Sequence, residues 1–349
     1  MGTRARDVRF IRTNRRKIVR TRVNWLNGLR VPEPLLLMRL SMIVNPLTGR
    51  NLQLAAQVGV EELVLAYPGL DLAQLRETKR WVESFGIRLT HVERKIPHLA
   101  FVHDLPGRAQ QVEDFKTLVR NMAETEMTVL CYNWMPAEDW QRTSADVLER
   151  GGAKVTEFNL RNIGRNVTDA DGRPAQPTPA AKLWDNLKRF LEEVVPVAED
   201  AGIKLALHPD DPPLPSVNGQ DQIIISNEAF RRVVDLVPSK ANGICYCVGS
   251  FSPAGVDLLG GIRSLAEKIF FFHARNVRGT AEHFVETWHD NGQIDMAAVF
   301  RTLKEIGYRG TVRPDHAPSM AGETNETPGY EMLGRLFAAG YLRGLMHAV

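Results

Sequence analysis

The stretch Ala201-Gly202-Ile203-Lys204-Leu205-Ala206-Leu207-His208 contains the pattern that repeats through this chain. A helix-like segment ends at a glycine, where a positive φ angle is often needed, and a short apolar run follows and ends in a polar residue. The same order of helix, glycine and strand recurs at Phe85-Gly86-Ile87 and at Ile306-Gly307-Tyr308. Such units predict βαβ repeats and therefore a parallel sheet.

Strand-like runs occur eight times along the chain. They are Leu40–Val44, Glu62–Ala66, Ile87–Glu93, Thr128–Asn133, Ile203–His208, Asn242–Cys247, Ile269–Asn276 and Thr311–Asp315. Helix candidates lie at about 50–59, 71–85, 109–125, 180–201, 228–237, 256–267, 295–306 and 328–346. Eight alternating units predict a closed (β/α)8 TIM barrel of the α/β class. An open doubly wound sheet is the alternative, but the turn after the first strand lacks a GxGxxG run.

One segment, residues 134–179, is too long for a simple connection. It contains a strand-like run at Lys154–Phe158 and a proline-rich run at Arg173–Pro179. Long functional insertions in a TIM barrel lie above the carboxyl ends of the strands. We therefore expect one catalytic domain over residues 39–349, in which residues 134–179 form a lid or the arm of a homo-oligomer, a dimer.

The charge of the chain is concentrated at its amino end. Residues 1–39 contain 11 of the 44 Lys and Arg residues and, with Asp7 and Glu33, only two of the 41 acidic residues, so the rest of the chain is acidic although the net charge is +3. A basic arm can bind nucleic acid, but this one lacks interleaved aromatic residues and any folded binding motif. We expect residues 1–38 to be a solvated, disordered extension, or the result of a start site placed upstream of Met38, and we expect no nucleic-acid partner.

The cysteines and the hydropathy indicate the compartment. The chain has three cysteines, an odd number, and no apolar signal segment, which argues against a disulfide framework and a secreted protein. No apolar run approaches the roughly 18 residues that a membrane-spanning helix needs. The sequence therefore predicts a cytoplasmic protein without a membrane segment.

Polar residues end the last four predicted strands. The relevant segments are His208-Pro209-Asp210-Asp211, Cys245-Tyr246-Cys247, His273-Ala274-Arg275-Asn276 and Arg313-Pro314-Asp315-His316. Each residue alone has a commoner structural explanation, such as a buried histidine or a turn. Because neighbouring strands of a barrel end at one rim, however, their coincidence favours a site that holds a divalent metal ion.

The ligand set predicted from these strand ends is His208, Cys247, His273 and Asp315. Cys245 and Cys247 point to one face of their strand, and the later residue lies nearer the rim, which favours Cys247. Thiolate and imidazole donors suit zinc, whereas magnesium is disfavoured.

Longer motifs surround these ligands. They are Asp104-Leu-Pro-Gly-Arg108, Cys131-Tyr-Asn-Trp-Met-Pro136 with Asp139-Trp140, His208-Pro-Asp-Asp-Pro-Pro213, Cys247-Val-Gly-Ser250, His273-Ala-Arg-Asn-Val277, Arg313-Pro-Asp-His316, Pro328-Gly-Tyr330 and Gly340-Tyr-Leu-Arg-Gly344. Together they closely resemble the mannonate dehydratase family of the hexuronate pathway over roughly residues 87–347. That resemblance implies a xylose-isomerase-like TIM barrel that removes water from D-mannonate to give 2-dehydro-3-deoxy-D-gluconate. It also implies the same four ligands, now for Mn²⁺ rather than zinc, with Fe²⁺, Zn²⁺ and Co²⁺ as alternatives.

The resemblance implies a functional tyrosine at Tyr330. Dehydration of a sugar acid removes the C2 proton and expels the C3 hydroxyl, so it needs a general acid and a general base. Tyr330 and His316 are the candidates for this pair, with neither role assigned to either residue. The residues expected to bind the substrate are the carboxylate-clamp candidates Arg275 and Arg313, together with Asn276, Asn133, Trp134, Asp210 and Asp211.

Two other functions stay open at this point. One is a sugar isomerase or epimerase of the same barrel superfamily, and the other is a binding protein that retains the metal without turnover. The chain departs from the family's usual pattern at Asn45-Pro46 and at Leu65-Ala66-Tyr67-Pro68-Gly69, and the 134–179 insertion is shorter than usual. These departures lie where the substrate would be read, so they bear on the identity of the sugar acid more than on the metal.

Overall fold

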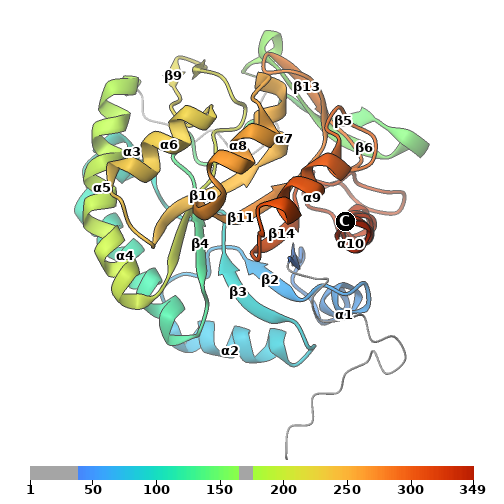
Figure 1. Cartoon of the computed structure of the whole chain (residues 1–349), viewed down its shortest axis with the longest axis horizontal. Coiled ribbons are helices and arrows are strands. Elements are labelled where there is room, and N and C mark those ends of the chain that lie inside the picture. Colours follow the sequence, from blue (N-terminus) through green and yellow to red (C-terminus); the bar gives the residue numbers. More distant parts are fainter. Residues whose placement is uncertain (1–37, 165–175) are drawn as a thin grey trace, which may run out of the picture. The chain divides into compact units, whose positions relative to one another are not determined.

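A computed structural model describes residues 38–164 and 176–349. Eight parallel strands form a closed barrel in the order β1-β14-β11-β10-β7-β4-β3-β2 (Figure 1). These strands are β1 (Arg39–Ile43), β2 (Glu62–Leu65), β3 (Arg88–Val92), β4 (Val129–Tyr132), β7 (Lys204–Leu207), β10 (Asn242–Cys247), β11 (Ile269–Ala274) and β14 (Thr311–Pro314). The predicted (β/α)8 barrel is therefore confirmed. Residues 1–37, which carry the basic extension, lie outside the described residues.

Helices surround the strands (Figure 1). They are α1 (Gly49–Gln57), α2 (Leu72–Glu83), α4 (Arg108–Glu124), α5 (Ala180–Ala201), α6 (Asn227–Leu236), α8 (Leu258–Ser264), α9 (Met296–Glu305) and α10 (Met332–Ala348), with the short α3 (Leu99–His103) and α7 (Val248–Phe251). The predicted segment 256–267 divides into α8 and a 3₁₀ turn at Ala266–Lys268. Within the described residues, no helix is long and apolar enough to cross a membrane.

Local signals in the sequence explain where several helices begin and end. The carboxylate of Asp71 accepts hydrogen bonds from the backbone N–H groups of Ala73 and Gln74 at the start of α2. Such a cap satisfies amide donors that the first helical turn leaves unpaired. Gly202 follows α5 with a φ of 69°, a left-handed conformation that side chains disfavour. The helix, glycine, strand pattern thus sets the connections at the amino end of the barrel.

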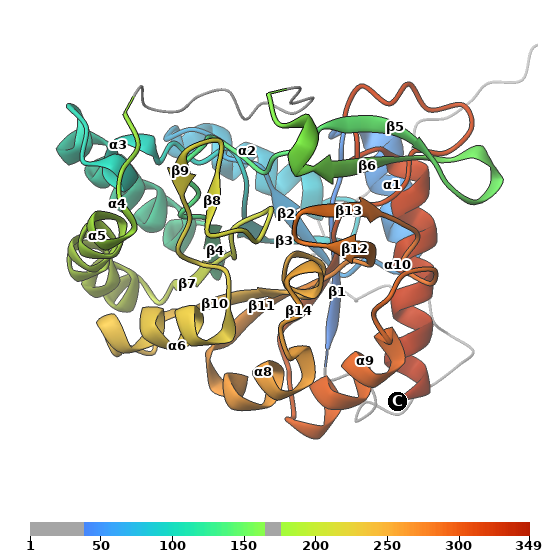
Figure 2. The ribbon, with the colours of Figure 1, turned by 90° about the horizontal axis from the view of Figure 1, so that it is seen from above.

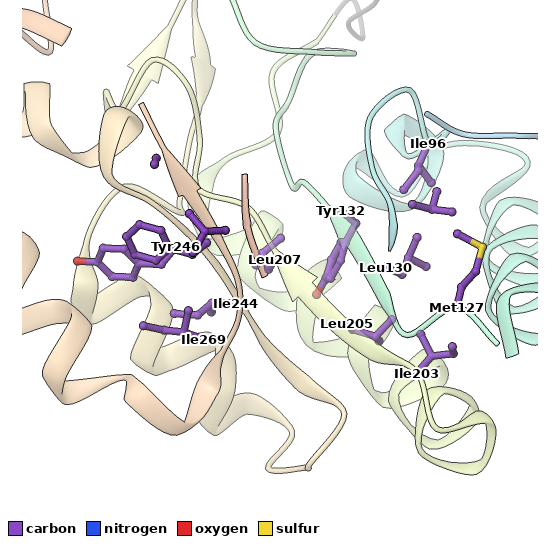
Figure 3. Packing of buried hydrophobic residues seen from close by; sticks show 14 of the residues in the cluster. Ile96, Met127, Leu130, Tyr132, Ile203, Leu205, Leu207, Ile244, Tyr246 and Ile269 are labelled. Carbon is purple, nitrogen blue, oxygen red and sulfur yellow. The ribbon is translucent and has the colours of Figure 1, made fainter. Parts of the chain in front are cut away.

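Alternation along the strands separates two apolar layers. Leu205, Ile244 and Tyr246 belong to the large cluster between strands and helices, part of which Figure 3 shows. Ala206, which follows Leu205, and Cys245, which lies between Ile244 and Tyr246, belong to a separate small cluster. Because successive strand residues point to opposite faces, the small cluster fills the interior of the barrel. The interior faces of β7 and β10 therefore lead directly to His208 and Cys247 at the rim.

The insertion forms part of a second, four-stranded sheet. Its strands β5 (Ser144–Leu148) and β6 (Lys154–Asn159) pair with β12 (Val277–Thr280) and β13 (His283–Glu286) in the order β12-β13-β6-β5. Figure 2 shows this sheet and the small β8–β9 hairpin (Ser216–Val217 and Gln220–Asp221) on one side of the barrel. The predicted strand-like run at Lys154–Phe158 corresponds to β6. Residues 165–175 of the insertion lie outside the described residues.

Candidate active site

Four side chains with metal-binding atoms converge at the rim of the barrel. They are His208, Cys247, His273 and Asp315, whose ligand atoms all lie within 4.8 Å of one another. Their strands β7, β10, β11 and β14 are successive neighbours in the barrel, and Cys247 lies beside His273 in the strand register. The Cys247 Sγ is 3.7 Å from the Asp315 Oδ2. Two imidazoles, a thiol and a carboxylate at this spacing fit a site for a divalent transition-metal ion.

Buried arginines hold the ligand carboxylate in its ionised form. Arg313 Nη2 donates to Asp315 Oδ1 at 2.8 Å, and Arg275 Nη1 lies 3.2 Å from Asp315 Oδ2. Burial alone would raise the pKa of Asp315, but the neighbouring His316, Arg313 and Arg275 hold it well below its ordinary value. Arg313 Nη2 also donates to Glu93 Oε1 at 3.0 Å. The site therefore presents negatively charged oxygen to a cation without an unpaired buried charge.

A hydrogen-bonded chain runs from the pocket to Glu286. The Tyr330 hydroxyl lies 3.0 Å from His316 Nε2, and His316 Nδ1 lies 2.6 Å from Glu286 Oε1. Burial lowers the pKa of His316 and raises the pKa of Tyr330, so both side chains are neutral near pH 7. The shorter Glu286 contact favours the tautomer in which Nδ1–H donates to Glu286 and the phenol donates to Nε2, although Arg275 Nη1 also lies 3.0 Å from Nδ1. The pair can therefore exchange protons with a molecule in the pocket.

The remote end of this chain is fixed by buried ion pairs. Arg142 donates to Asp211 Oδ1 at 2.8 Å and to Glu286 Oε1 at 2.5 Å. Arg275 Nη2 donates to Asp211 Oδ2 at 2.8 Å. Burial would raise the pKa of Glu286, but the neighbouring His316 and the two arginines lower it to about 2. The network ties the insertion and β13 to the rim of the barrel.

A pocket opens beside the metal-binding cluster. Its empty volume is about 560 Å³ with open solvent included, and the predicted site residues in its wall are Asn133, His208, Asp211, Arg275, Arg313, Asp315, His316 and Tyr330. The structure therefore brings two of the four expected ligands, His208 and Asp315, and both candidates for proton transfer to the wall of one pocket. Cys247 and His273 lie directly behind this wall, where their ligand atoms complete the cluster.

Comparison with known proteins identifies the family. A sequence model described as D-mannonate dehydratase (UxuA) matches residues 49–172 and 176–349. This chain belongs to the D-mannonate dehydratase family. It is accordingly an enzyme of the hydro-lyase class with a site suited to a metal ion. The predicted family resemblance is confirmed.

Individual relatives agree with this assignment. A mannonate dehydratase from Oceanobacillus iheyensis is 33% identical over 299 residues, which cover 79% of this chain and 85% of the relative. One from Streptococcus agalactiae serotype Ia is 32% identical over 335 residues, covering 87% and 95%. The crystal structure of mannonate dehydratase from Streptococcus suis serotype 2 superposes with a TM-score of 0.80 at 31% identity, covering 89% and 94%. A D-tagatose 3-epimerase-like protein, with a TM-score of 0.60 at 16% identity, shares the fold.

Three residues that the sequence placed in the substrate pocket point elsewhere. Trp134 packs in the core outside the barrel and donates to the Leu183 carbonyl, whereas Asn133 faces the pocket. The Asn276 amide donates to the backbone carbonyls of residues 289 and 294, and Asp210 accepts from the backbone N–H groups of residues 223 and 224. Alternation explains Trp134 and Asn276, because each follows a residue that faces the pocket.

Several pocket residues were missed by the sequence reading. Arg94 lies with its guanidinium 3.7 Å from the centre of the Tyr330 ring and donates to Asp139 at 2.8 Å. Its φ of 70° is unusual for a residue other than glycine. The Trp140 ring centre is 4.2 Å from that of His316. Glu93 and Arg94 lie at the end of the third strand, so the strand-end test applied to the last four strands also identifies them.

A second cavity adjoins the first above β1 and β2. Arg94, Asp139, Trp140 and Tyr330 line both cavities and form the wall between them. The remaining walls come mostly from the segments around Asn45, Tyr67 and Thr327. Two of these segments are the ones at which the sequence analysis expects a departure from the family pattern. These segments therefore face the first pocket across a wall of four side chains.

Proposed function

We propose that this enzyme removes water from D-mannonate to give 2-dehydro-3-deoxy-D-gluconate in hexuronate catabolism. The observation that carries the proposal is the placement of the Tyr330 hydroxyl and His316 Nε2, 3.0 Å apart, in the pocket beside the cluster of His208, Cys247, His273 and Asp315. Loss of water from C2 and C3 leaves negative charge beside the substrate carboxylate, and it moves one proton away from carbon and another onto oxygen. A cation site beside an acid–base pair meets both needs.

The proposed ion is Mn²⁺, with Fe²⁺, Zn²⁺ and Co²⁺ as alternatives. The cluster offers two imidazole nitrogens, one sulfur and one carboxylate oxygen, a donor set that borderline ions accept. When bound, the ion supplies Lewis-acid stabilisation of the negative charge that develops on the substrate. The family resemblance favours Mn²⁺ among these ions.

His316 and Tyr330 are the proposed acid–base pair. One of them takes the C2 proton, and the other protonates the departing C3 hydroxyl. Glu286 accepts from His316 Nδ1, which orients the ring and stabilises it when it becomes protonated. The guanidinium of Arg94 against the Tyr330 ring holds the phenol in place.

Arg313 is the proposed partner of the substrate carboxylate. Its Nη2 donates to Glu93 and Asp315, whereas its Nη1 is a buried donor without a hydrogen-bond partner among the described residues. An unpaired buried donor is costly, so a substrate oxygen at this position gains affinity. Arg275 is already paired with Asp211 and lies against Asp315, and we propose that it orients these groups as well as the substrate.

The dehydration is tested directly with metal-loaded full-length protein. Incubation with D-mannonate and Mn²⁺ is expected to form a 2-keto acid, and ¹³C NMR distinguishes loss of water from isomerisation or epimerisation. The Asp315→Asn variant is the control for metal-dependent turnover. Absence of product from D-mannonate and from a panel of other aldonates contradicts the proposal.

We further propose a cytoplasmic homodimer that uses the β5 edge. In the described part of the chain β5 pairs with β6 alone, so its other edge is open. Leu148 on β5 is 69% exposed. It pairs in register with Lys154 of β6, and the backbone of Lys154 also forms a β-bridge with Ser319, which precedes the exposed Met320. Exposed apolar side chains beside an open strand edge favour self-association. Light scattering is expected to give a dimer that Leu148→Arg weakens, and a monomeric wild type contradicts this arrangement.

The proposed compartment is the cytoplasm, because the three free, buried cysteines suit a reducing environment.

A further inference from the structure

A second group of metal-binding side chains lies beneath the four ligands at the rim. Cys131 on β4 and Cys245 on β10 are fully buried, and their sulfur atoms and a ring nitrogen of His273 all lie within 4.8 Å of one another. Cys245 precedes Cys247 by two residues on the same face of β10. Cys245 therefore lies roughly 7 Å further into the barrel than Cys247. His273 belongs to both groups.

The separation of the strands argues against a disulfide between these cysteines. β7 lies between β4 and β10 in the barrel, which places the two Cα atoms about two strand spacings, roughly 9–10 Å, apart. A disulfide requires Cα atoms about 4.4–6.8 Å apart. A metal ion bridges a wider gap, because bonds of about 2.3 Å to each thiolate allow the sulfur atoms to be almost 4 Å apart.

The charge balance of this lower group favours a divalent ion. Cys131 and Cys245 are both fully buried, so a net charge in this group would be costly. Ala206 and Phe271 belong to the same apolar cluster as the two cysteines. A divalent ion that binds two thiolates and a neutral imidazole forms a complex without net charge, and two protons leave to the solvent.

We propose that Cys131, Cys245 and His273 form a second site for a thiophilic cation such as Cd²⁺ or Zn²⁺, and that this site competes with the catalytic site for His273. Cys131 lines the active-site pocket, which gives an ion a route to the lower group. The lower group offers two sulfur donors, which suit soft ions such as Cd²⁺. The rim offers one sulfur together with nitrogen and oxygen donors, so Mn²⁺ prefers the rim. A neutral imidazole has one unprotonated nitrogen, so His273 serves one site at a time.

The decisive experiment removes the thiol of the catalytic site. Metal-depleted, full-length Cys247→Ser protein is titrated with Cd²⁺ while the ultraviolet charge-transfer absorption of Cd²⁺–thiolate bonds is recorded. The absorption is expected to persist in Cys247→Ser and to be lost when Cys245→Ala is added. A folded Cys247→Ser protein without this absorption, or an absorption that Cys245→Ala leaves unchanged, overturns the proposal. The readout involves no turnover, so it is independent of the proposed dehydration.

Two further measurements protect the result against misfolding of Cys247→Ser. In an Asp315→Asn background, which keeps all three thiols, the addition of Cys245→Ala must lower the Cd²⁺–thiolate absorption. Electron paramagnetic resonance of free Mn²⁺ tests the competition in otherwise wild-type protein. Cd²⁺ is expected to release Mn²⁺ from the wild type at lower concentration than from Cys245→Ala, and equal release curves contradict competition through His273.

Discussion

The two sides of the barrel mouth are built from different kinds of residue. On one side β7, β10, β11 and β14 lead to buried, charged or metal-binding side chains that pair with one another, such as Asp315 with Arg313. On the other side β1 and β2 lead to neutral residues, including Asn45 and Tyr67, that line an open cavity. The groups proposed for metal binding and proton transfer are thus concentrated on the first side, whereas the second is the side proposed to contact the rest of the substrate.

The two sides of the mouth therefore differ in how strongly their side chains depend on one another. Buried ion pairs are mutually dependent, because the loss of one partner leaves the other charged and unpaired at a cost of about 3–5 kcal/mol. Side chains that line an open cavity lack this constraint. The departures from the family pattern that the sequence analysis expects at Asn45-Pro46 and Leu65–Gly69 fall on the less constrained side.

The largest expected effect comes from the charged side. Asp315→Asn removes a ligand and leaves Arg313 and Arg275 without their shared carboxylate. We expect loss of bound Mn²⁺ and a decrease in turnover beyond the roughly 100-fold typical of residues that only support a ligand. Metal analysis and the keto-acid assay measure both effects. Asp146→Asn, at an exposed carboxylate paired with Lys154, is the control, and normal metal content in Asp315→Asn excludes Asp315 as a ligand.

Removal of one hydroxyl separates proton transfer from metal binding. Tyr330→Phe keeps the ring against Arg94 but removes the hydrogen bond to His316. We expect kcat to fall by about 10²–10⁴ with KM and Mn²⁺ content nearly unchanged. Tyr67→Phe on the opposite side is the matched control and should retain its kcat. Equal kcat values for wild type and Tyr330→Phe would remove the phenol from the mechanism.

His91 on β3 makes a contribution to stability that depends on pH. Burial lowers its pKa from 6.5 to about 4, with Glu62 opposing the shift. Below about pH 6.5 the unfolded chain binds a proton at His91, whereas the folded protein binds it only below about pH 4. The contribution of neutral His91 to the free energy of unfolding is therefore fully present above pH 6.5 and is lost as the pH falls from 6.5 to 4. The loss is about 3 kcal/mol.

Chemical denaturation at pH 7 and at pH 4.5 measures this contribution. His91→Asn should flatten the difference in the free energy of unfolding between the two conditions and leave Mn²⁺ content at pH 7 intact. The same pH dependence in variant and wild type contradicts a buried, neutral His91.

The smallest effect is expected in the open cavity. Tyr67→Ala enlarges it without touching an ion pair or a ligand. We expect KM, or the preference among aldonates, to change by about tenfold or less, with kcat for the preferred substrate and Mn²⁺ content unaffected. A large loss of kcat or of metal would show that the two sides of the mouth are not separable.

Much of the site could be predicted from strand ends because the barrel brings them together. His208, Cys247, His273 and Asp315 each end a recognisable strand, so counting strands was enough to place them at one rim. The same logic identifies Glu93 when it is applied to the third strand.

Other parts of the site follow from tertiary contacts that no periodicity indicates. Glu286 lies on β13, in an excursion after β11, and it reaches His316 only because β13 pairs with β6 of the insertion. Arg142 belongs to an irregular segment, and its partners Asp211 and Glu286 are 69 and 144 residues away. Trp134 shows the reverse case. It follows the pocket residue Asn133 in the sequence, but its side chain points into the core.

A crystal structure of the Mn²⁺-loaded enzyme, with anomalous data collected at the manganese edge, tests the central claim most directly. One anomalous peak is expected within bonding distance of His208, Cys247, His273 and Asp315, with Tyr330 and His316 facing the same pocket. A peak elsewhere, or one that lacks these four residues as ligands, would contradict the division of the barrel mouth into a chemical side and a substrate-reading side.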